Sequence, residues 1–306
     1  MPQTRDAVIV DYLRSPFSRS RPRDPERDVF NSLRMDDVAA TLVKELIKRT
    51  KVKPEEIGEL LAGCAQPWDE QFMYGARNIA FLAELPFSVA GQHVDRQCGS
   101  SMSTIHLGAM GIMLGYQDIV ISVGIEHMTH VPMPGPGVDP SKLVGKPNMK
   151  LFSEPQYAKY DYMTTLNMGL TAEKLFAHRD FTREDMDKWA LGSHQKAAKA
   201  LEEGFFKGEI MPFEVTLADG TKKVIDYDVS IRADTTLEGL AALKPSFKPD
   251  GQITAGNSSP LNAAATAMML MSKEKVKEYG LKPLATIASM GWAGVDPSMM
   301  GLGPVP

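Results

Sequence analysis

Hydrophobic residues follow two different spacings in the first part of the chain, and these spacings predict strands that alternate with helices. Residues 7–13 form a short apolar run rich in β-branched side chains, which is typical of a buried strand. Between residues 35 and 46 the apolar positions recur every three or four residues, as on one face of a helix that covers a sheet. Further along the chain the same patterns predict strands at 57–64, 88–94 and 119–124 and helices at 74–85 and 100–114. This alternation favours a parallel sheet covered on both faces.

One cysteine stands where the third predicted strand meets the next helix. Cys98 is followed by Gly99 and by the small residues Ser100 and Ser101. The free N–H groups and positive dipole at a helix start favour the reactive thiolate, and N–H groups there can stabilise an oxyanion. The next helix is apolar on nearly all sides, which predicts a place at the centre of the fold and puts Cys98 at the carboxyl end of a central strand. Spacing alone leaves open whether Cys98 is a nucleophile or a buried structural cysteine, because free cysteines are often buried.

The pattern becomes irregular after residue 133. Prolines and glycines are concentrated between residues 132 and 147 and disfavour regular structure. The methionines scattered through this region either fill gaps in a loose layer or form an adaptable apolar wall for a flexible ligand. Beyond it we predict helices at 171–179 and at 183–204, the second capped by Thr182, and a polar strand pair at 213–226.

A compact pattern returns from residue 251. It predicts a buried strand at 263–271, a short helix at 273–279 and a further strand at 285–290. The chain then ends at residue 306 with no predicted helix to cover that last strand, as in a domain that has begun and is not finished.

Composition and charge exclude several classes of protein. The 306 residues predict two domains, or one core with a long insertion. Cys64 and Cys98 cannot form a disulfide framework, no cluster has zinc-ligand spacing, and Cys64 is expected to pack in the core, so a reducing, cytoplasmic setting is expected. The sequence has neither a signal peptide nor an apolar run of membrane-spanning length. The net charge of −4 gives no reason to expect nucleic acid, although arginines at positions 14, 19, 21 and 23 form either a solvated loop or a contact for an acidic partner or a phosphate.

Six short motifs occur in order along nearly the whole chain. They are VIVD with RSP at 8–16, DRQCGSSM at 95–102, GIEHM with HVPM at 124–133, MGLTAE at 168–173, TAGNSS at 254–259, and DPS with MGLGPV at 296–305. Together they resemble the thiolase family, and in particular the degradative 3-ketoacyl-CoA thiolases (acetyl-CoA acyltransferases). The HVPM motif is similar to that of the β-subunit of bacterial fatty-acid oxidation complexes.

The resemblance implies an α/β, thiolase-like fold of two similar halves, each a five-stranded mixed sheet with helices. On this basis we expect an N-terminal half at 1–126 that carries the nucleophile. An inserted, irregular loop domain at 127–250 would bind CoA and the acyl chain, and 251–306 would be the start of a truncated C-terminal half.

The resemblance also implies a reaction. In the family, the cysteine that matches Cys98 attacks the 3-keto carbon of a 3-ketoacyl-CoA, acetyl-CoA leaves, and incoming CoA takes the acyl group from the cysteine during fatty-acid β-oxidation. Coenzyme A is then a co-substrate, and no tightly bound cofactor or metal is expected. The residues that match CoA or pocket contacts in relatives are Met168, Arg232, Phe247, Ala255 and Ser259. Without the resemblance, Arg232 would be interpreted as one side of a surface salt bridge.

The family further implies a homodimer or a larger homo-oligomer, with a hydratase/dehydrogenase subunit of a β-oxidation complex as a further partner. Asn167 stands where many biosynthetic relatives carry a histidine, which favours the degradative branch over an acetoacetyl-CoA thiolase. The sequence still leaves the biosynthetic activity open.

The chain lacks three residues that thiolases use: the His of a Gly-His-Pro motif, the Asn of an Asn-Glu-Ala-Phe motif and a second Cys near the C-terminus. His106, His127, His130 and His194 do not stand in a matching motif. We therefore expect this chain alone to lack turnover. The sequence also leaves open a non-catalytic fragment that binds acyl-CoA or a partner subunit. A papain-like cysteine hydrolase would need a His partner as well, but the local signature of that family is missing around Cys98.

Overall fold

The computed structural model describes residues 5–71, 74–133 and 148–306, which fall into two compact units that we treat separately. Unit 1 consists of Met1–Val144, Phe206–Ser230 and Leu261–Met290. Unit 2 consists of Gly145–Phe205, Ile231–Pro260 and Gly291–Pro306. These boundaries differ from the expected ones at residues 126 and 250. The proline- and glycine-rich run at 134–147 lies outside the described residues, so the irregular structure expected there stays a prediction.

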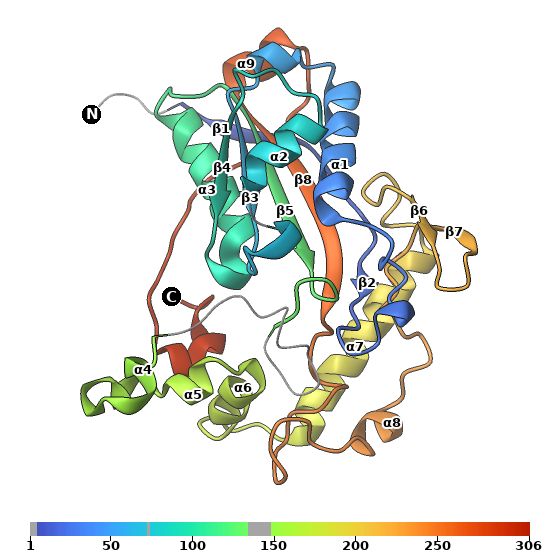
Figure 1. The fold of residues 1–306 in the computed structure, drawn as a ribbon, viewed down its shortest axis with the longest axis vertical. Helices are drawn as coiled ribbons and strands as arrows, with labels where there is room; N and C mark the ends of the chain where they lie inside the picture. The colour runs from blue at the N-terminus through green and yellow to red at the C-terminus, as the bar shows by residue number, and fades with distance from the viewer. Residues whose placement is uncertain (1–4, 72–73, 134–147) are drawn as a thin grey trace. The chain divides into compact units, whose positions relative to one another are not determined.

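Unit 1 is built around a mixed sheet (Figure 1) with the strand order β4-β3-β5-β8-β1-β9, and β2 pairs with β8. The strands are β1 (Ala7–Arg14), β2 (Ser18–Arg19), β3 (Glu59–Gly63), β4 (Ala90–Val94), β5 (Ile119–His127), β8 (Asn262–Ser272) and β9 (Ala285–Thr286). β3 is parallel to β4 and β5, whereas β8 is antiparallel to both β5 and β1. The all-parallel sheet inferred from alternation is therefore wrong, and the mixed sheet implied by the family resemblance is confirmed.

β5 and β8 are the central pair of this sheet. They run side by side from the pair Ile119↔Met271 to the pair His127↔Ala263. Both are continuous apolar runs, because strands buried on both faces need no polar side. The strand predicted at 263–271 is confirmed, but it completes the first sheet and does not begin a second one. The boundary expected at residue 251 consequently does not separate two sheets.

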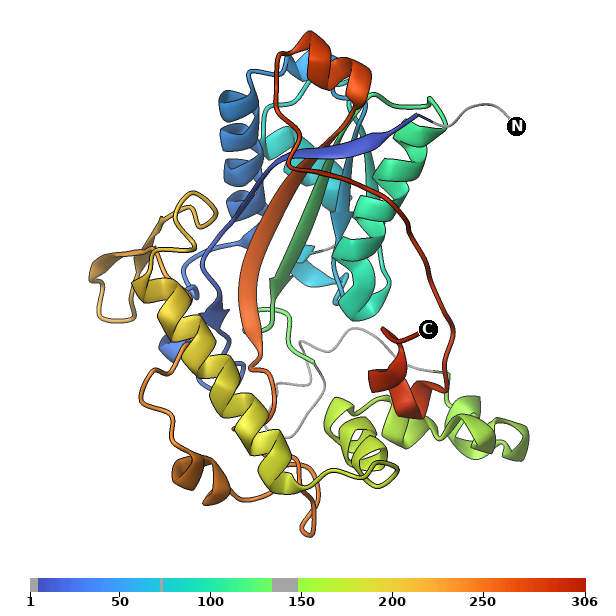
Figure 2. The same cartoon turned by 180° about the vertical axis from the view of Figure 1, so that it is seen from behind.

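Helices cover both faces of the sheet (Figures 1 and 2): α1 and α2 lie on one face and α3 on the other. Side chains of β5 alternate between two core clusters. Ile121 packs in the cluster that contains Leu46 of α1, while Val120 packs in the cluster that contains Ile112 of α3. The helices of unit 1 are α1 (Met35–Thr50), α2 (Gly75–Leu82), α3 (Ser100–Met113) and α9 (Lys273–Glu278). All four occur where the sequence pattern predicts them.

Three sequence-based expectations about unit 1 need correction. β4, the strand before Cys98, is at the edge of the sheet and not at its centre, because within the described residues it pairs with β3 alone. α3 is buried only on the side that faces the sheet, and Met102 on its other side is 58% exposed. The strand predicted at 285–290 is reduced to the two residues of β9.

Unit 1 also contains the predicted polar strand pair, β6 (Phe213–Thr216) and β7 (Lys222–Ile225), which is antiparallel. The regular elements of unit 2 are α4 (Lys150–Ser153), α5 (Tyr162–Thr165), α6 (Met168–Phe176), α7 (Arg183–Glu202), α8 (Leu237–Ala241) and the 3-10 helix η7 (Pro297–Leu302). Thr182 caps α7 in a capping box, as predicted. Among the described residues, we find no helix with the length and apolarity needed to cross a membrane.

Candidate active site

Cys98 lies in a short turn between β4 and α3, inside the 3-10 helix η4 (Gln97–Gly99). The side chain of Cys98 is exposed to solvent. Gln97, directly before it, has a φ of +48°, a left-handed conformation that costs a non-glycine residue about 1 kcal/mol. The carboxylate of Asp95 accepts a hydrogen bond from the N–H of Gln97 at 2.9 Å and so supports this conformation. The predicted strand-to-helix turn is confirmed, and the exposed thiol argues against the alternative of a buried structural cysteine.

Two glycines make room for the first turn of α3. Gly63, the last residue of β3, pairs with Gly124 inside the neighbouring strand β5. A Cβ atom on Gly63 would lie 2.6 Å from the backbone carbon of Ser100, and one on Gly124 would lie 2.3 Å from Oγ of Ser101. The close approach of helix and sheet at this point therefore requires glycine in both strands.

A partly buried carboxylate lies behind the turn. Glu126, near the end of β5, accepts hydrogen bonds from the N–H of Ala65 at 2.9 Å and from Nε2 of Gln71 at 2.8 Å. The thiol of Cys64 lies 3.7 Å from the same carboxylate. Burial raises the pKa of Glu126, and burial together with the charge of Glu126 raises the pKa of the Cys64 thiol. Cys64 is buried, as expected, and is a poor nucleophile in this setting.

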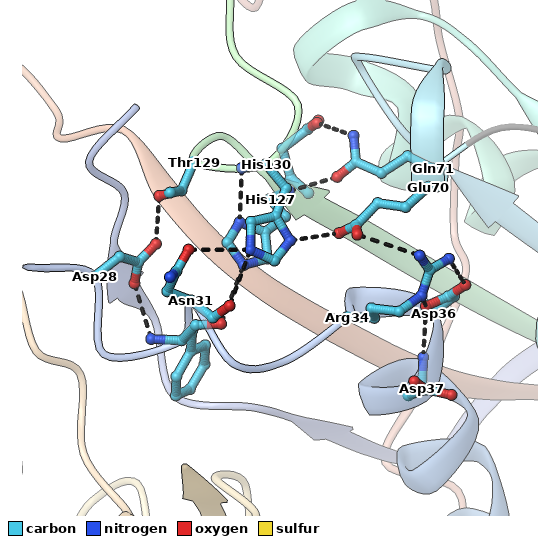
Figure 3. A network of polar contacts seen from close by, with 12 residues as sticks. Asp28, Asn31, Arg34, Asp36, Asp37, Glu70, Gln71, His127, Thr129 and His130 are labelled. Carbon is cyan, nitrogen blue, oxygen red and sulfur yellow. Dashed lines mark hydrogen bonds and ion pairs between the residues drawn. The ribbon is translucent and has the colours of Figure 1, made fainter. Parts of the chain in front are cut away.

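Two histidines at the end of β5 stack on each other (Figure 3). The ring centroids of His127 and His130 are 3.6 Å apart and the rings are nearly parallel. Nδ1 of His130 lies 2.9 Å from a carboxylate oxygen of Glu70, and Nε2 lies 3.1 Å from the carbonyl oxygen of Asn31. Because both partners accept hydrogen bonds, we assign a hydrogen to both ring nitrogens, which makes the ring an imidazolium. Burial lowers the pKa of His130, but the hydrogen bond and charge of Glu70 outweigh burial and the net shift is upward.

The ring of His127 has the opposite protonation state from that of His130. It is fully buried, its Nδ1 accepts a hydrogen bond from the N–H of His130 at 3.4 Å, and its Nε2 lies 3.2 Å from the carbonyl oxygen of Phe30. Only Nε2 then carries a hydrogen, so the ring is neutral. Burial and the positive charge of His130 both lower the pKa of His127. The ring nitrogens of both histidines are engaged in the fold, which gives them a structural role.

In unit 2, the start of α6 brings two predicted site residues together. The ring of Phe247 packs so closely on Gly169 that a Cβ atom there would lie 2.0 Å from it, and Met168 is the preceding residue. Asn167 caps α6 through its side-chain oxygen, which accepts hydrogen bonds from the N–H groups of Gly169 and Leu170. Phe247 is 40% exposed, so part of its apolar ring is accessible to a ligand.

The loop that carries Ala255 and Ser259 is fixed by hydrogen bonds of a neighbouring side chain, that of Asn257. Asn257 accepts a hydrogen bond from the N–H of Thr254 at 2.8 Å and donates one to the carboxylate of Asp187 in α7 at 3.1 Å. Ala255 and Ser259 themselves are exposed. The loop is therefore fixed while these two residues face solvent.

Arg232 lies on a separate segment of unit 2. Its backbone N–H donates a hydrogen bond to Nδ1 of His194 in α7 at 3.3 Å, and the residue is exposed. Cys98 belongs to unit 1, whereas the five residues matched to CoA contacts all belong to unit 2. Sequence reasoning missed the positioning residues Gly63, Gly124 and Glu126, although a glycine at a strand end is a recognisable signal of close packing. The described residues contain no group of three or more His, Cys, Asp or Glu that could hold a metal ion.

Comparisons with known proteins agree with one another. A family model described as "Thiolase, N-terminal domain" matches residues 7–274. The chain is 45% identical over 304 residues to a 3-ketoacyl-CoA thiolase of Aliivibrio fischeri, an alignment that covers 99% of this chain and 74% of the relative. A 3-ketoacyl-CoA thiolase of Vibrio parahaemolyticus is 44% identical over 306 residues, with 99% and 73% covered.

Solved structures give the same result. Human mitochondrial 3-ketoacyl-CoA thiolase matches with a TM-score of 0.83 and 31% identity, over 99% of this chain and 74% of the other. The acetyl-CoA acetyltransferase of Syntrophomonas wolfei matches with a TM-score of 0.82 and 31% identity, over 98% and 73%. With this fold, and with an accessible cysteine at the junction of β4 and α3, the chain belongs to the thiolase family.

Proposed function

We propose that this protein carries out the thiolytic cleavage of 3-ketoacyl-CoA to acetyl-CoA and a shortened acyl-CoA in fatty-acid β-oxidation. The observation that carries the proposal is the exposed thiol of Cys98 in a strained, hydrogen-bonded turn at the start of α3. The names of the relatives from Aliivibrio fischeri and Vibrio parahaemolyticus support the substrate class.

In the proposed reaction the thiolate of Cys98 attacks the 3-keto carbon of the substrate. The bond between carbons 2 and 3 breaks, carbon 2 takes up a proton, and acetyl-CoA leaves. The acyl group remains on Cys98 as a thioester. The thiolate of a second CoA then attacks this thioester and releases the shortened acyl-CoA and free Cys98, so that one difficult step becomes two easier ones.

Five residues of unit 2 are proposed to contact coenzyme A. Phe247 offers an accessible apolar face beside Met168, which suits a pantetheine chain or an acyl chain. The exposed guanidinium of Arg232 suits a phosphate group. Ala255 and Ser259, on a loop fixed by Asn257, can approach a ligand without a large side chain in the way. Coenzyme A is a co-substrate in this proposal.

Trapping of the acyl-enzyme tests the nucleophile. The protein is mixed with a 3-ketoacyl-CoA, quenched in acid and analysed by intact mass and peptide mapping. We expect an acyl adduct on the peptide with Cys98 and its absence in Cys98→Ala. Cys64→Ala is the matched control because Cys64 is the other cysteine of the chain and is buried, and this variant should keep the adduct. An adduct on another residue, or none, would contradict the proposal.

The degradative branch is favoured over an acetoacetyl-CoA thiolase by Asn167, whose side chain is committed to capping α6. Rates of adduct formation with acetoacetyl-CoA and with 3-ketoacyl-CoA of longer chains separate the two. Faster reaction with the longer chains is expected, and a clear preference for acetoacetyl-CoA would reverse the assignment.

We also propose that the protein forms a homodimer, and that a hydratase/dehydrogenase subunit is a further partner. Support for the homodimer comes from β4, which pairs on one side only and is mostly exposed, and from Phe87 nearby, which is 87% exposed. Unpaired strand edges and exposed aromatic side chains are typical of interfaces. Two free cysteines support a reducing, cytoplasmic location. Sedimentation equilibrium tests the dimer, and Phe87→Asp should weaken it.

A further inference from the structure

We propose that Ser100 is the positioning residue of the Cys98 turn, acting through its buried side-chain hydroxyl. The proposal rests on the proposed role of Cys98 as the nucleophile. Ser100 is the first residue of α3 and is only 2% exposed, so its hydroxyl does not itself meet the substrate.

The hydroxyl of Ser100 joins three backbone segments. Its Oγ accepts a hydrogen bond from the N–H of Arg96 at 2.9 Å. The single hydroxyl hydrogen has two acceptors in reach, the carbonyl oxygen of Gln97 at 2.6 Å and the carbonyl oxygen of Cys64 at 3.2 Å. One side chain therefore connects the approach to Cys98, the residue directly before it, and the loop after β3.

The conformation of Gln97 explains why this contact matters. A residue with positive φ that is not glycine is held only when its surroundings over-determine it. Gln97 is held through both of its backbone polar groups, because Asp95 accepts from its N–H and its carbonyl oxygen accepts from both the backbone N–H and the hydroxyl of Ser100. Loss of either side-chain contact weakens this hold on Gln97, and the direction of the Cys98 thiol changes with it.

The loop to which Ser100 is tied is itself fixed. Cys64 supplies the carbonyl oxygen, and the adjacent N–H of Ala65 is bonded to the partly buried carboxylate of Glu126 near the end of β5. The same carboxylate accepts from Gln71, whose side-chain oxygen in turn accepts a hydrogen bond from the N–H of His127. The Cys98 turn is thus connected, through Ser100, to the central strand of the sheet.

Ser103 provides a matched control on the same helix. It is 1% exposed, and within the described parts of the chain its hydroxyl has no hydrogen-bond partner. Ser103→Ala removes the same atom from an equally buried site of α3 without releasing the turn. Asp95→Ala removes the other support of Gln97 from an exposed position, where the fold does not depend on it.

Two rates are measured for the unsubstituted protein and for Ser100→Ala, Ser103→Ala and Asp95→Ala: acylation of Cys98 by a 3-ketoacyl-CoA at increasing concentration, and alkylation of Cys98 by iodoacetamide. We expect Ser100→Ala to lower the limiting acylation rate about 10- to 100-fold, with a change in half-saturating concentration of less than about threefold. Asp95→Ala should change in the same direction, and Ser103→Ala should stay within about twofold of the unsubstituted protein.

Alkylation keeps this test separate from that of the proposed function. If Cys98 is not acylated in the unsubstituted protein, the proposed function fails, but a changed alkylation rate in Ser100→Ala and Asp95→Ala still supports the positioning role. Acylation and alkylation rates that stay within about twofold in both variants would overturn it. If Ser100→Ala does not fold, Asp95→Ala decides the question alone.

Discussion

Replacing Glu70 by Gln should destabilise unit 1 in a manner that depends on pH. The carboxylate of Glu70 contacts Nδ1 of His130 at 2.9 Å and a guanidinium nitrogen of Arg34 at 3.4 Å, and Arg34 also pairs with Asp36 at the start of α1 (Figure 3). The substitution keeps the shape of the side chain and removes its charge. His130 then faces an amide, and the stacked ring of His127 remains beside it.

The loss in the free energy of unfolding caused by Glu70→Gln can be estimated from the two contacts of Glu70. The side chains of Glu70 and His130 are 12% and 22% exposed, so their hydrogen bond is largely shielded and contributes about 1.5–3 kcal/mol while His130 is charged. Arg34 is half exposed, so solvent screens its contact with Glu70, which adds about 0–1 kcal/mol. The expected loss in the free energy of unfolding is therefore about 1.5–4 kcal/mol in slightly acidic solution.

The direction of the pH dependence follows from the pKa of His130. In the folded protein this pKa is raised above its value of about 6.5 in the unfolded chain. The folded state therefore binds more protons between the two values, and the stabilisation is fully present below pH about 6.5 and is lost as the pH rises through the folded pKa. Above the folded pKa the ring of His130 is neutral, and its hydrogen bond with Glu70 then contributes only about 0.5–1.5 kcal/mol to the free energy of unfolding.

Urea unfolding of the unsubstituted protein and Glu70→Gln at about pH 6 and about pH 9 measures the effect. The difference between the two proteins should be at least about 1 kcal/mol larger at the lower pH. Glu84→Gln is the control, because Glu84 pairs with Lys44 on the surface, where both side chains are exposed, and this variant should show no such pH dependence. A loss that is equal at both pH values, or an NMR titration that puts the pKa of His130 below that of free imidazole, would refute the assignment of His130 as an imidazolium.

Three further substitutions test other features. Thr182→Ala removes the cap of α7 and should lower the free energy of unfolding by about 1 kcal/mol in urea titration. An unchanged free energy of unfolding would show that the capping box does not stabilise the protein. Gly63→Ala places a Cβ atom 2.6 Å from the backbone of Ser100, so it should cost about 1–3 kcal/mol and slow acylation of the nucleophile; unchanged stability and rate would contradict the close packing. Gly169→Ala displaces the ring of Phe247 and should raise the Kd for CoA several-fold in a direct binding assay, whereas an unaltered Kd would remove Phe247 from the proposed CoA site.

Local patterns in the sequence were sufficient to predict the elements of unit 1 but not their order in the sheet. The apolar run of β5 and the helical spacing of apolar residues in α1 each indicate that one segment is buried. Such a pattern does not indicate which other segment lies beside it. Alternation of strands and helices suggested a parallel sheet, whereas β8, with its continuous run of alanines and methionines, pairs antiparallel with β5 and β1. That pairing connects residues far apart in the chain and leaves no local signal.

In the candidate site too, features made by contiguous residues could be predicted from the sequence, whereas contacts between distant segments could not. The strand, cysteine and small residues around Cys98 are contiguous, so the sequence predicted the turn, while spacing alone left the exposure of the thiol open. The support of the turn by Glu126 joins segments that the chain brings together only on folding. Ser100 was recognised for its small size, while its hydrogen bonds across to Cys64 depend on the spacing between β3 and α3. Gly63 looked like one of many glycines until its position in the sheet was known.

The position of β8 has a consequence for how the protein is made. Its neighbours β1 and β5 are synthesised first, and roughly 130 further residues must follow β5 before β8 leaves the ribosome, which takes about ten seconds at ordinary rates of translation. During this interval both neighbours have an unpaired apolar edge where β8 will insert. Such non-local pairing makes folding slow and exposes the nascent chain to aggregation, so unit 1 should depend on chaperones more than a sheet of the same size assembled in sequence order.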